Sequence, residues 1–331
     1  MKILLGNNSY DWMAGSETWM YTLGAELLRR GHQVTAYSPQ LGFMATKMEA
    51  LGIGCVSEIA VEKRLKSFDP MLTEEEGGYD IIICAHYAIT RYLHERLAGV
   101  PIIAVCHGVL HDGPQGEILP EHPVTEFAVD QYIAVSEEVQ TLLKQRYDID
   151  SLLLRNFFDL ERFKKEGKLP DKPKTFLVNS NYWGVDDDIN KIIREVAQHY
   201  DARFLGIGAN FSPCFEVEQI VGEADVVFGM GRSVQEAACM GKLAVVHGRW
   251  GTGGVITPES YPKLKLTNFS GRPIEEGRYT PLLSAEEIIA DIDANFNQKN
   301  VDAVYRLFKK DHNVSAAADM LLGVANSLIA K

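Results

Sequence analysis

The chain has 331 residues, of which 46% are hydrophobic and 24% charged, which is typical of a globular protein of about two domains. Its formal net charge of -12 argues against a general nucleic-acid binder, because no excess of cations is available to displace phosphate counterions. No apolar stretch approaches the roughly 20 residues that span a bilayer, the apolar run at the start is too short for a signal peptide, and the cysteines lack metal or redox spacing. We therefore expect a cytoplasmic protein with reduced thiols.

The first half alternates short apolar runs with helical patterns, which predicts parallel strands joined by helices. The expected strands are Ile3–Leu5, Val34–Tyr37, Ile81–Cys84, Ile102–Cys106, Tyr132–Val135 and Leu152–Leu154. The expected helices lie between Ser16 and Gly31, over Ala88–Leu97, and from a cap at Ser136 to about Tyr147.

The first of these helices follows a polar loop that ends in Gly15. We expect Ser16 to cap this helix, and free backbone N–H groups at its start offer an anion site that Gly15 brings close to a ligand. Gly15 also has a purely structural interpretation as the residue of a tight turn. The loop lacks a G-x-G-x-x-G fingerprint, so a nicotinamide or flavin site has little support.

Two histidines follow predicted strands directly. His107 comes after Ile102–Cys106 and His86 after Ile81–Cys84, so both face the edge of the sheet where parallel folds bind ligands. Without a clear third ligand, we expect no metal there.

The charged, proline-broken stretch Lys164–Lys174 predicts a linker between two domains. The alternation then resumes with the strand Phe176–Val178, a helix near Ile189–Ala197 and the strand Phe204–Ile207. The tail is expected to be helical. Ser284 and Glu287 form a capping box, and the helix Val314–Ile329 has an apolar face through Ala317, Leu321, Val324 and Leu328.

After the strand Phe204–Ile207, the sequence predicts another strand at Val226–Phe228, followed by the loop Gly229–Arg232. We expect the next helix to be capped by Ser233 and to end at Gly241. A helix start attracts phosphate, and Arg232 adds a fork-shaped cation beside Gly231. Glu236 lies one turn into the helix, where its carboxylate is placed to accept hydrogen bonds from the hydroxyls of a ribose.

A second strand, Leu243–Val246, leads to a loop that contains Gly253 and Gly254. These features together predict a site for a nucleotide diphosphate. The alternative is that Ser233 and Glu236 form only a capping box, which binds nothing.

Six motifs follow one another along the chain: Ala14-Gly15-Ser16-Glu17, Gly31-His32-Gln33-Val34-Thr35, the stretch ending in His107-Gly108, Ala134-Val135-Ser136-Glu137, Arg155-Asn156 with Asp159 to Phe163, and Glu236-Ala237-Ala238-Cys239-Met240-Gly241. In this order they resemble the motifs of the retaining, family-4-like GT-B glycosyltransferases. The resemblance implies an α/β protein of two Rossmann-like domains facing each other across a cleft. We place an acceptor-side domain at 1–165 and a nucleotide-sugar domain at 166–312, with the helix 313–331 returning to the first domain.

The chain departs from the family pattern twice. Phe228 stands where the family's first glutamate is expected, and the stretch from Val178 has no basic residue before Lys191, where the family has an arginine and a lysine. Arg232 is the candidate replacement for that cationic clamp.

The resemblance implies metal-independent transfer of a sugar, with retention, from a nucleotide diphosphate sugar to a saccharide or lipid-linked hydroxyl acceptor. No cofactor is expected, no nucleic-acid partner and no transmembrane segment, although peripheral membrane contact is compatible with it. His107 and Glu236 are the expected catalytic residues, and Gly15, Ser16, Gly231, Arg232, Ser233, Glu236, Gly253 and Gly254 the expected donor-binding ones. A GT-B-like sugar-nucleotide epimerase and a non-catalytic sugar-nucleotide-binding relative remain alternatives.

Overall fold

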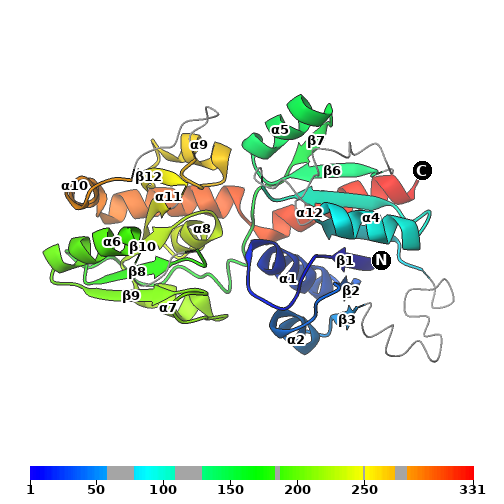
Figure 1. The fold of residues 1–331 in the computed structure, drawn as a ribbon, viewed down its shortest axis with the longest axis horizontal. Coiled ribbons are helices and arrows are strands. Elements are labelled where there is room, and N and C mark those ends of the chain that lie inside the picture. The colour runs from blue at the N-terminus through cyan, green and yellow to red at the C-terminus, as the bar shows by residue number, and fades with distance from the viewer. Residues whose placement is uncertain (58–77, 109–128, 183–186, 249, 273–281) are drawn as a thin grey trace. The chain divides into compact units, whose positions relative to one another are not determined.

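The structure, a computed structural model, describes residues 1–57, 78–108, 129–182, 187–248, 250–272 and 282–331 (Figure 1). The chain divides into two compact units. The first consists of Met1–Phe157 together with Val314–Lys331, and the second of Phe158–Asn313.

The first unit contains a sheet whose described strands are all parallel, in the order β3-β2-β1-β4-β5-β6-β7. Its strands are β1 (Lys2–Gly6), β2 (Gln33–Tyr37), β3 (Gly54–Val56), β4 (Ile81–Ala85), β5 (Ile102–Cys106), β6 (Gln131–Ala134) and β7 (Ser151–Leu153). Its helices are α1 (Gly15–Arg29), α2 (Phe43–Ala50), α4 (Tyr87–Arg96), α5 (Glu137–Tyr147) and α12 (Val314–Ile329). The predicted parallel α/β architecture is confirmed, and α2 and β3 are additions that the sequence pattern did not reveal.

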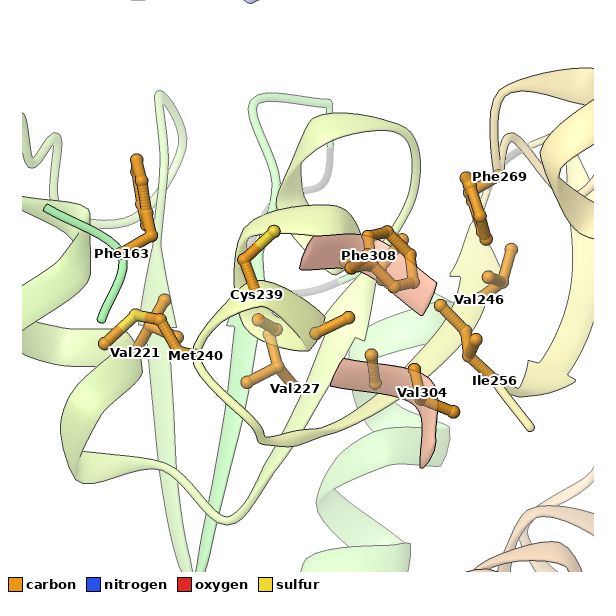
Figure 2. Close-up of a cluster of buried hydrophobic side chains, with 14 of the residues drawn as sticks. Phe163, Val221, Val227, Cys239, Met240, Val246, Ile256, Phe269, Val304 and Phe308 are labelled. Atoms are coloured by element: carbon orange, nitrogen blue, oxygen red, sulfur yellow. The ribbon is translucent and has the colours of Figure 1, made fainter. Parts of the chain in front are cut away.

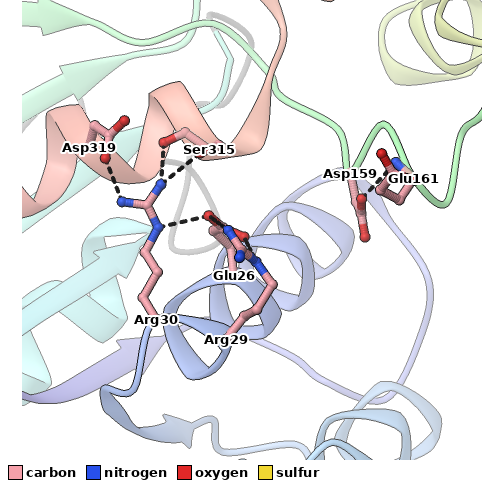
Figure 3. Close-up of polar contacts among 7 residues, drawn as sticks. All are labelled: Glu26, Arg29, Arg30, Asp159, Glu161, Ser315 and Asp319. Atoms are coloured by element: carbon pink, nitrogen blue, oxygen red, sulfur yellow. Dashed lines mark hydrogen bonds and ion pairs between the residues drawn. The ribbon is translucent and has the colours of Figure 1, made fainter.

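The final helix α12 belongs to the first unit and packs on α1. Arg30 fixes the contact, because its guanidinium donates to the Asp319 carboxylate at 2.5 Å and to the Ser315 carbonyl at 2.7 Å (Figure 3). Glu26 holds the same guanidinium from the α1 side. Of the predicted apolar face, Ala317 and Leu321 are buried, whereas Val324 and Leu328 are only partly so.

The second unit contains a sheet in the order β12-β11-β10-β8-β9. Its strands are β8 (Thr175–Asn179), β9 (Arg203–Ile207), β10 (Val226–Gly229), β11 (Leu243–Gly248) and β12 (Gly251–Val255), of which β12 is antiparallel to β11. Its helices are α6 (Asp188–His199), α7 (Val217–Glu223), α8 (Arg232–Cys239), α9 (Tyr261–Leu264), the short 3-10 turn η3 (Lys265–Thr267), α10 (Ala285–Asn295) and α11 (Gln298–Asp311).

Alternation along the strands creates two hydrophobic layers in this unit. Val226 and Phe228 of β10 face the layer that α6 and α10 cover. Val227 between them faces the other layer, formed with α7, α8 and α11 (Figure 2). Both faces of the sheet are therefore buried, as continuous apolar runs predict for a parallel sheet.

The predicted first domain boundary at 165 lies too far along the chain. Phe158 and Phe163 are buried in the hydrophobic core of the second unit, and Lys165 is ion-paired with Asp302 of α11. The charged stretch Lys164–Lys174 is thus tied to the second unit by its own side chains rather than forming a free linker.

Candidate functional site

In the sheet of the second unit, the order in which successive strands are added reverses between β8 and β10. Strand β8 pairs with β9 on one side and with β10 on the other, so the loops after β8 and β10 diverge at its carboxyl edge. Such a switch point is where open parallel sheets bind ligands. Helix α8 begins at this point, directly after β10.

Helix α8 begins at Arg232 with Gly231 as its N-cap, two residues earlier than the predicted cap at Ser233. Ser233 is therefore inside the first turn and is not the cap. No side chain caps this helix, so the predicted capping box of Ser233 and Glu236 does not form. A capping box therefore does not account for Glu236. The predicted end of the helix at Gly241 is confirmed by its left-handed φ of 70°.

Gly231 has φ 57° and ψ -129°, a backbone conformation that side chains disfavour. Its N–H donates to the carbonyl of Phe269 at 2.8 Å. This N–H is therefore already hydrogen-bonded within the protein and does not bind a phosphate. The prediction that Gly231 binds the donor through its backbone is wrong. The role of Gly231 is to make the sharp turn that starts the helix.

Arg232 is buried at the start of α8 without a full set of partners. Its Nε lies 3.8 Å from Oε1 of Glu236, and the two side chains are only 12% and 10% exposed. Both Nε and Nη1 of Arg232 are buried with no hydrogen-bond partner among the described residues. Burial lowers the pKa of the guanidinium, against the attraction of Glu236. Burying a cation whose N–H donors lack acceptors destabilises the folded protein, unless a bound anion accepts those hydrogen bonds.

Glu236 is buried next to this cation. Burial raises the pKa of its carboxyl group, and the positive charges of Arg232 and Arg162 lower it by a smaller amount. The carboxylate is thus kept in an apolar setting within one helical turn of the proposed phosphate site.

A second ion pair, which the sequence did not single out, lies near the first. Arg162 donates through Nε and Nη2 to Oε2 of Glu218, at 3.0 and 2.8 Å. Glu218 is in the first turn of α7, and the charges of both residues act on Glu236. Arg162 belongs to a segment quoted above for its family resemblance, which is the only signal in the sequence that pointed to it.

The predicted loop at Gly253 and Gly254 is wrong, because both residues belong to strand β12. A Cβ at Gly253 would lie 2.4 Å from Leu264 and one at Gly254 2.7 Å from the Asp291 carboxylate. Close packing of β12 on the rest of the unit therefore explains both glycines without a ligand.

In the sheet of the first unit, the order in which successive strands are added reverses between β1 and β4. Ser16, in the first turn of α1, bridges this point. Its hydroxyl lies 3.3 Å from Nε2 of His86, which follows β4, and donates to Oε2 of Glu17 at 3.0 Å. The helix begins at Gly15 with Ala14 as N-cap and no side-chain cap, so the predicted capping role of Ser16 is also wrong.

His107 lies where the sequence predicts, directly after β5. Its ring meets the fully buried Trp19 of α1 edge to face, with 5.3 Å between centroids. The same tryptophan contacts Phe157, at 4.6 Å. His107, His86 and the start of α1 at Gly15 therefore all lie at the carboxyl edge of this sheet.

Among the described residues, no group of three or more His, Cys, Asp or Glu side chains is arranged to hold a metal ion. In the same part of the chain, no helix is both long enough and apolar enough to cross a membrane.

Residues 13–162 match the sequence profile of Glycosyltransferase Family 4. No curated protein matches the chain. A glycosyltransferase from Rickettsia africae superposes with a TM-score of 0.66 at 14% identity, covering 99% of this chain and 98% of the other. Anabaena Alr3699/HepE, solved with UDP and glucose, gives a TM-score of 0.62 at 14% identity, covering 99% and 100%. The calicheamicin glycosyltransferase CalG4 gives 0.52 at 15% identity, covering 97% of each chain.

These structures are alike in fold across nearly their whole lengths, and the family match covers the motifs at Gly15, His107 and Arg155. The chain therefore has the GT-B fold of these glycosyltransferases, and its residues 13–162 form a Glycosyltransferase Family 4 segment.

Proposed function

We propose that the protein transfers a sugar from a nucleoside diphosphate sugar to a hydroxyl group of a saccharide or lipid-linked acceptor, with retention at the anomeric carbon and without a metal ion. The observation that carries the proposal is the buried Arg232 guanidinium at the start of α8, with Nε and Nη1 unpartnered in the described residues. A guanidinium grips two phosphate oxygens at once, so a diphosphate supplies the acceptors that this side chain lacks.

In the proposed reaction, the bond between the anomeric carbon and the diphosphate oxygen breaks. A bond from the acceptor oxygen to the same face of that carbon forms, and the acceptor proton passes to the departing diphosphate. Negative charge develops on the leaving group. Arg232 and the positive end of the α8 dipole stabilise that charge, which is the work that a metal ion does in other transferases.

The remaining residues take supporting roles. Glu236 accepts hydrogen bonds from the ribose hydroxyls, and Ser233 offers its N–H at the first turn of α8. In the first unit, Gly15 and Ser16 at the start of α1 form a second anion-attracting helix end. His107 hydrogen-bonds a hydroxyl of the transferred sugar.

The relative from Anabaena was solved with UDP and glucose, so uridine diphosphate sugars are the first donors to test. A thermal-shift panel of uridine, guanosine, adenosine and thymidine diphosphate sugars identifies the donor, because a ligand that binds only the folded state raises the melting temperature.

Incubation of the protein with that donor, first alone and then with acceptors, tests the activity. A glycoside that retains the donor's anomeric configuration supports the proposal. An epimerised donor in the absence of acceptor indicates an epimerase instead. Donor binding with no product across saccharide and lipid-linked acceptors indicates a binding protein.

A further inference from the structure

The segment 158–163 contributes twice to the site in the second unit. Its first residue, Phe158, lies beneath the Arg232 guanidinium, with 4.6 Å from Cζ to the ring centroid. Near its end, Arg162 places a second guanidinium over the rings of Phe163 and Phe215, at 5.2 and 4.7 Å. Stacking on aromatic rings fixes a guanidinium plane while leaving its edges free to donate.

Only one edge of the Arg162 guanidinium is occupied. Nε and Nη2 donate to Glu218, and Nη2 also donates to the carbonyl of Phe215. Nη1 makes no hydrogen bond within the described residues. Its two N–H groups are therefore available to an incoming acceptor.

Arg162, Glu218, Arg232 and Glu236 form one electrostatic group, which we call the charge cluster. Arg162 lowers the pKa of both Arg232 and Glu236, and Glu218 raises the pKa of Glu236. The two positive and two negative charges cancel when all four groups are ionised. The side chains of Arg162 and Glu218 are 22% and 20% exposed, so this second pair is more open to solvent than Arg232 and Glu236.

A cluster of zero net charge does not by itself attract a diphosphate with two negative charges. Arg232 is already opposed by Glu236, so a diphosphate is held more strongly if a second guanidinium also donates to it. We propose that Arg162 is that second cation, which binds the donor diphosphate through Nη1, and that Glu218 holds it in place at a cost in affinity. The inference rests on the proposed function and adds to it the replacement for the second basic residue of the missing clamp.

The competing explanation is structural. In it, Arg162 and Glu218 only fasten the segment 158–163 to the start of α7. Removal of either partner then breaks the same contact, and both changes act on any bound ligand in the same direction. The proposed cation role predicts opposite directions, because one change removes a positive charge from the cluster and the other removes a negative one.

The test is calorimetric binding to wild type, Arg162→Gln and Glu218→Gln. The probe is whichever diphosphate of uridine, guanosine, adenosine or thymidine binds wild type most tightly, with its nucleoside for comparison. We expect Arg162→Gln to weaken diphosphate binding by about tenfold or more and Glu218→Gln to strengthen it by roughly threefold, since charged hydrogen bonds and charge neutralisation act on the phosphates. Nucleoside affinity should stay the same in all three proteins.

Arg203 and Glu223 provide a matched control, because they form an exposed ion pair in the same unit, 54% and 53% exposed. Their glutamine variants should leave diphosphate binding unchanged. Arg162→Lys keeps the charge without the fork and should recover part of the lost affinity. This variant guards against a folding defect in Arg162→Gln, as do melting curves of every protein.

Equal weakening by Arg162→Gln and Glu218→Gln, or no effect of either, overturns this inference. If Arg232→Gln weakens diphosphate binding in the same series, the proposed function stands and only the role of Arg162 falls. If wild type binds none of the four diphosphates, the proposed function and this inference fall together.

Discussion

The guanidinium of Arg232 lies over the ring of Phe158, the first residue of the second unit, with 4.6 Å between Cζ and the ring centroid. Phe158 is fully buried, and its backbone N–H donates to the carbonyl of His312, next to the point where the chain leaves the unit again. The proposed phosphate clamp is therefore anchored where the chain enters and leaves this unit.

The ionisation of Glu236 makes stability depend on pH. Burial raises the pKa of Glu236 above its unfolded value, so the folded state prefers the protonated carboxyl. Its contribution to stability is fully present below the unfolded pKa and is lost as pH rises through the folded pKa. We expect the free energy of unfolding of wild type, relative to Glu236→Gln, to fall as pH rises through that window. Denaturant titrations of both proteins across acid to neutral pH measure it, and a difference that is constant with pH would refute the assignment.

The same variant separates binding from folding. Since α8 has no capping box, Gln at 236 removes no cap, and we expect the helix to persist. If Glu236 holds the ribose, Glu236→Gln should weaken the binding of both the diphosphate and the nucleoside. Unchanged nucleoside affinity by calorimetry would contradict the ribose role.

The turn at Gly231 is expected to demand glycine. Gly231→Ala should destabilise the protein by about 1–3 kcal/mol, because alanine resists this backbone conformation. Space is not the cause, since a Cβ at Gly231 would come no closer than 3.9 Å to the Asn268 carbonyl. Gly54→Ala is the control, because Gly54 lacks a positive φ and no described atom lies within 4 Å of a Cβ built there. Chemical denaturation that gave equal losses for both variants would argue against a conformational origin.

His107 should matter more for turnover than for donor affinity. A neutral hydrogen bond contributes about 0.5–1.5 kcal/mol, so His107→Ala should lower kcat by roughly 2- to 12-fold if the bond strengthens in the transition state. His94→Ala, on α4 of the same unit, is the control. Steady-state kinetics that showed loss only in KM would assign His107 to ground-state binding.

The elements that alternate regularly were predictable from the sequence, and those set by tertiary contacts were not. β5 and α12 lie within the expected bounds because their apolar patterns are long and continuous. The N-caps of α1 and α8 lie two residues before the predicted serine caps, because backbone geometry rather than a serine side chain begins these helices. The sequence predicts a loop in place of β12, because it does not distinguish glycines that pack against Leu264 and Asp291 from glycines of a flexible loop.

The candidate site shows the same division. Arg232 and Glu236 were identifiable because they share one short helix at the end of a strand. Arg162 and Glu218 were not, since the residues lie far apart in the chain and only the folded unit joins segment 158–163 to α7.

Transfer is expected to need no added metal, because Arg232 and the start of α8 supply positive charge at the leaving group. Turnover should be the same in excess chelator as in magnesium or manganese. Activity that disappeared with chelator and returned with either ion would show that the diphosphate is held by a metal rather than by Arg232 alone.

The central claim, that Arg232 binds the donor diphosphate, is tested most directly by calorimetry on wild type, Arg232→Gln and Arg232→Lys. A charge-assisted hydrogen bond contributes roughly 1.5–3 kcal/mol, so Arg232→Gln should weaken binding of the nucleoside diphosphate by about 10- to 150-fold. Arg232→Lys should recover only part of that loss, since lysine keeps the charge without the fork, and the nucleoside should bind all three proteins equally. Equal diphosphate affinity in the three proteins would contradict the account.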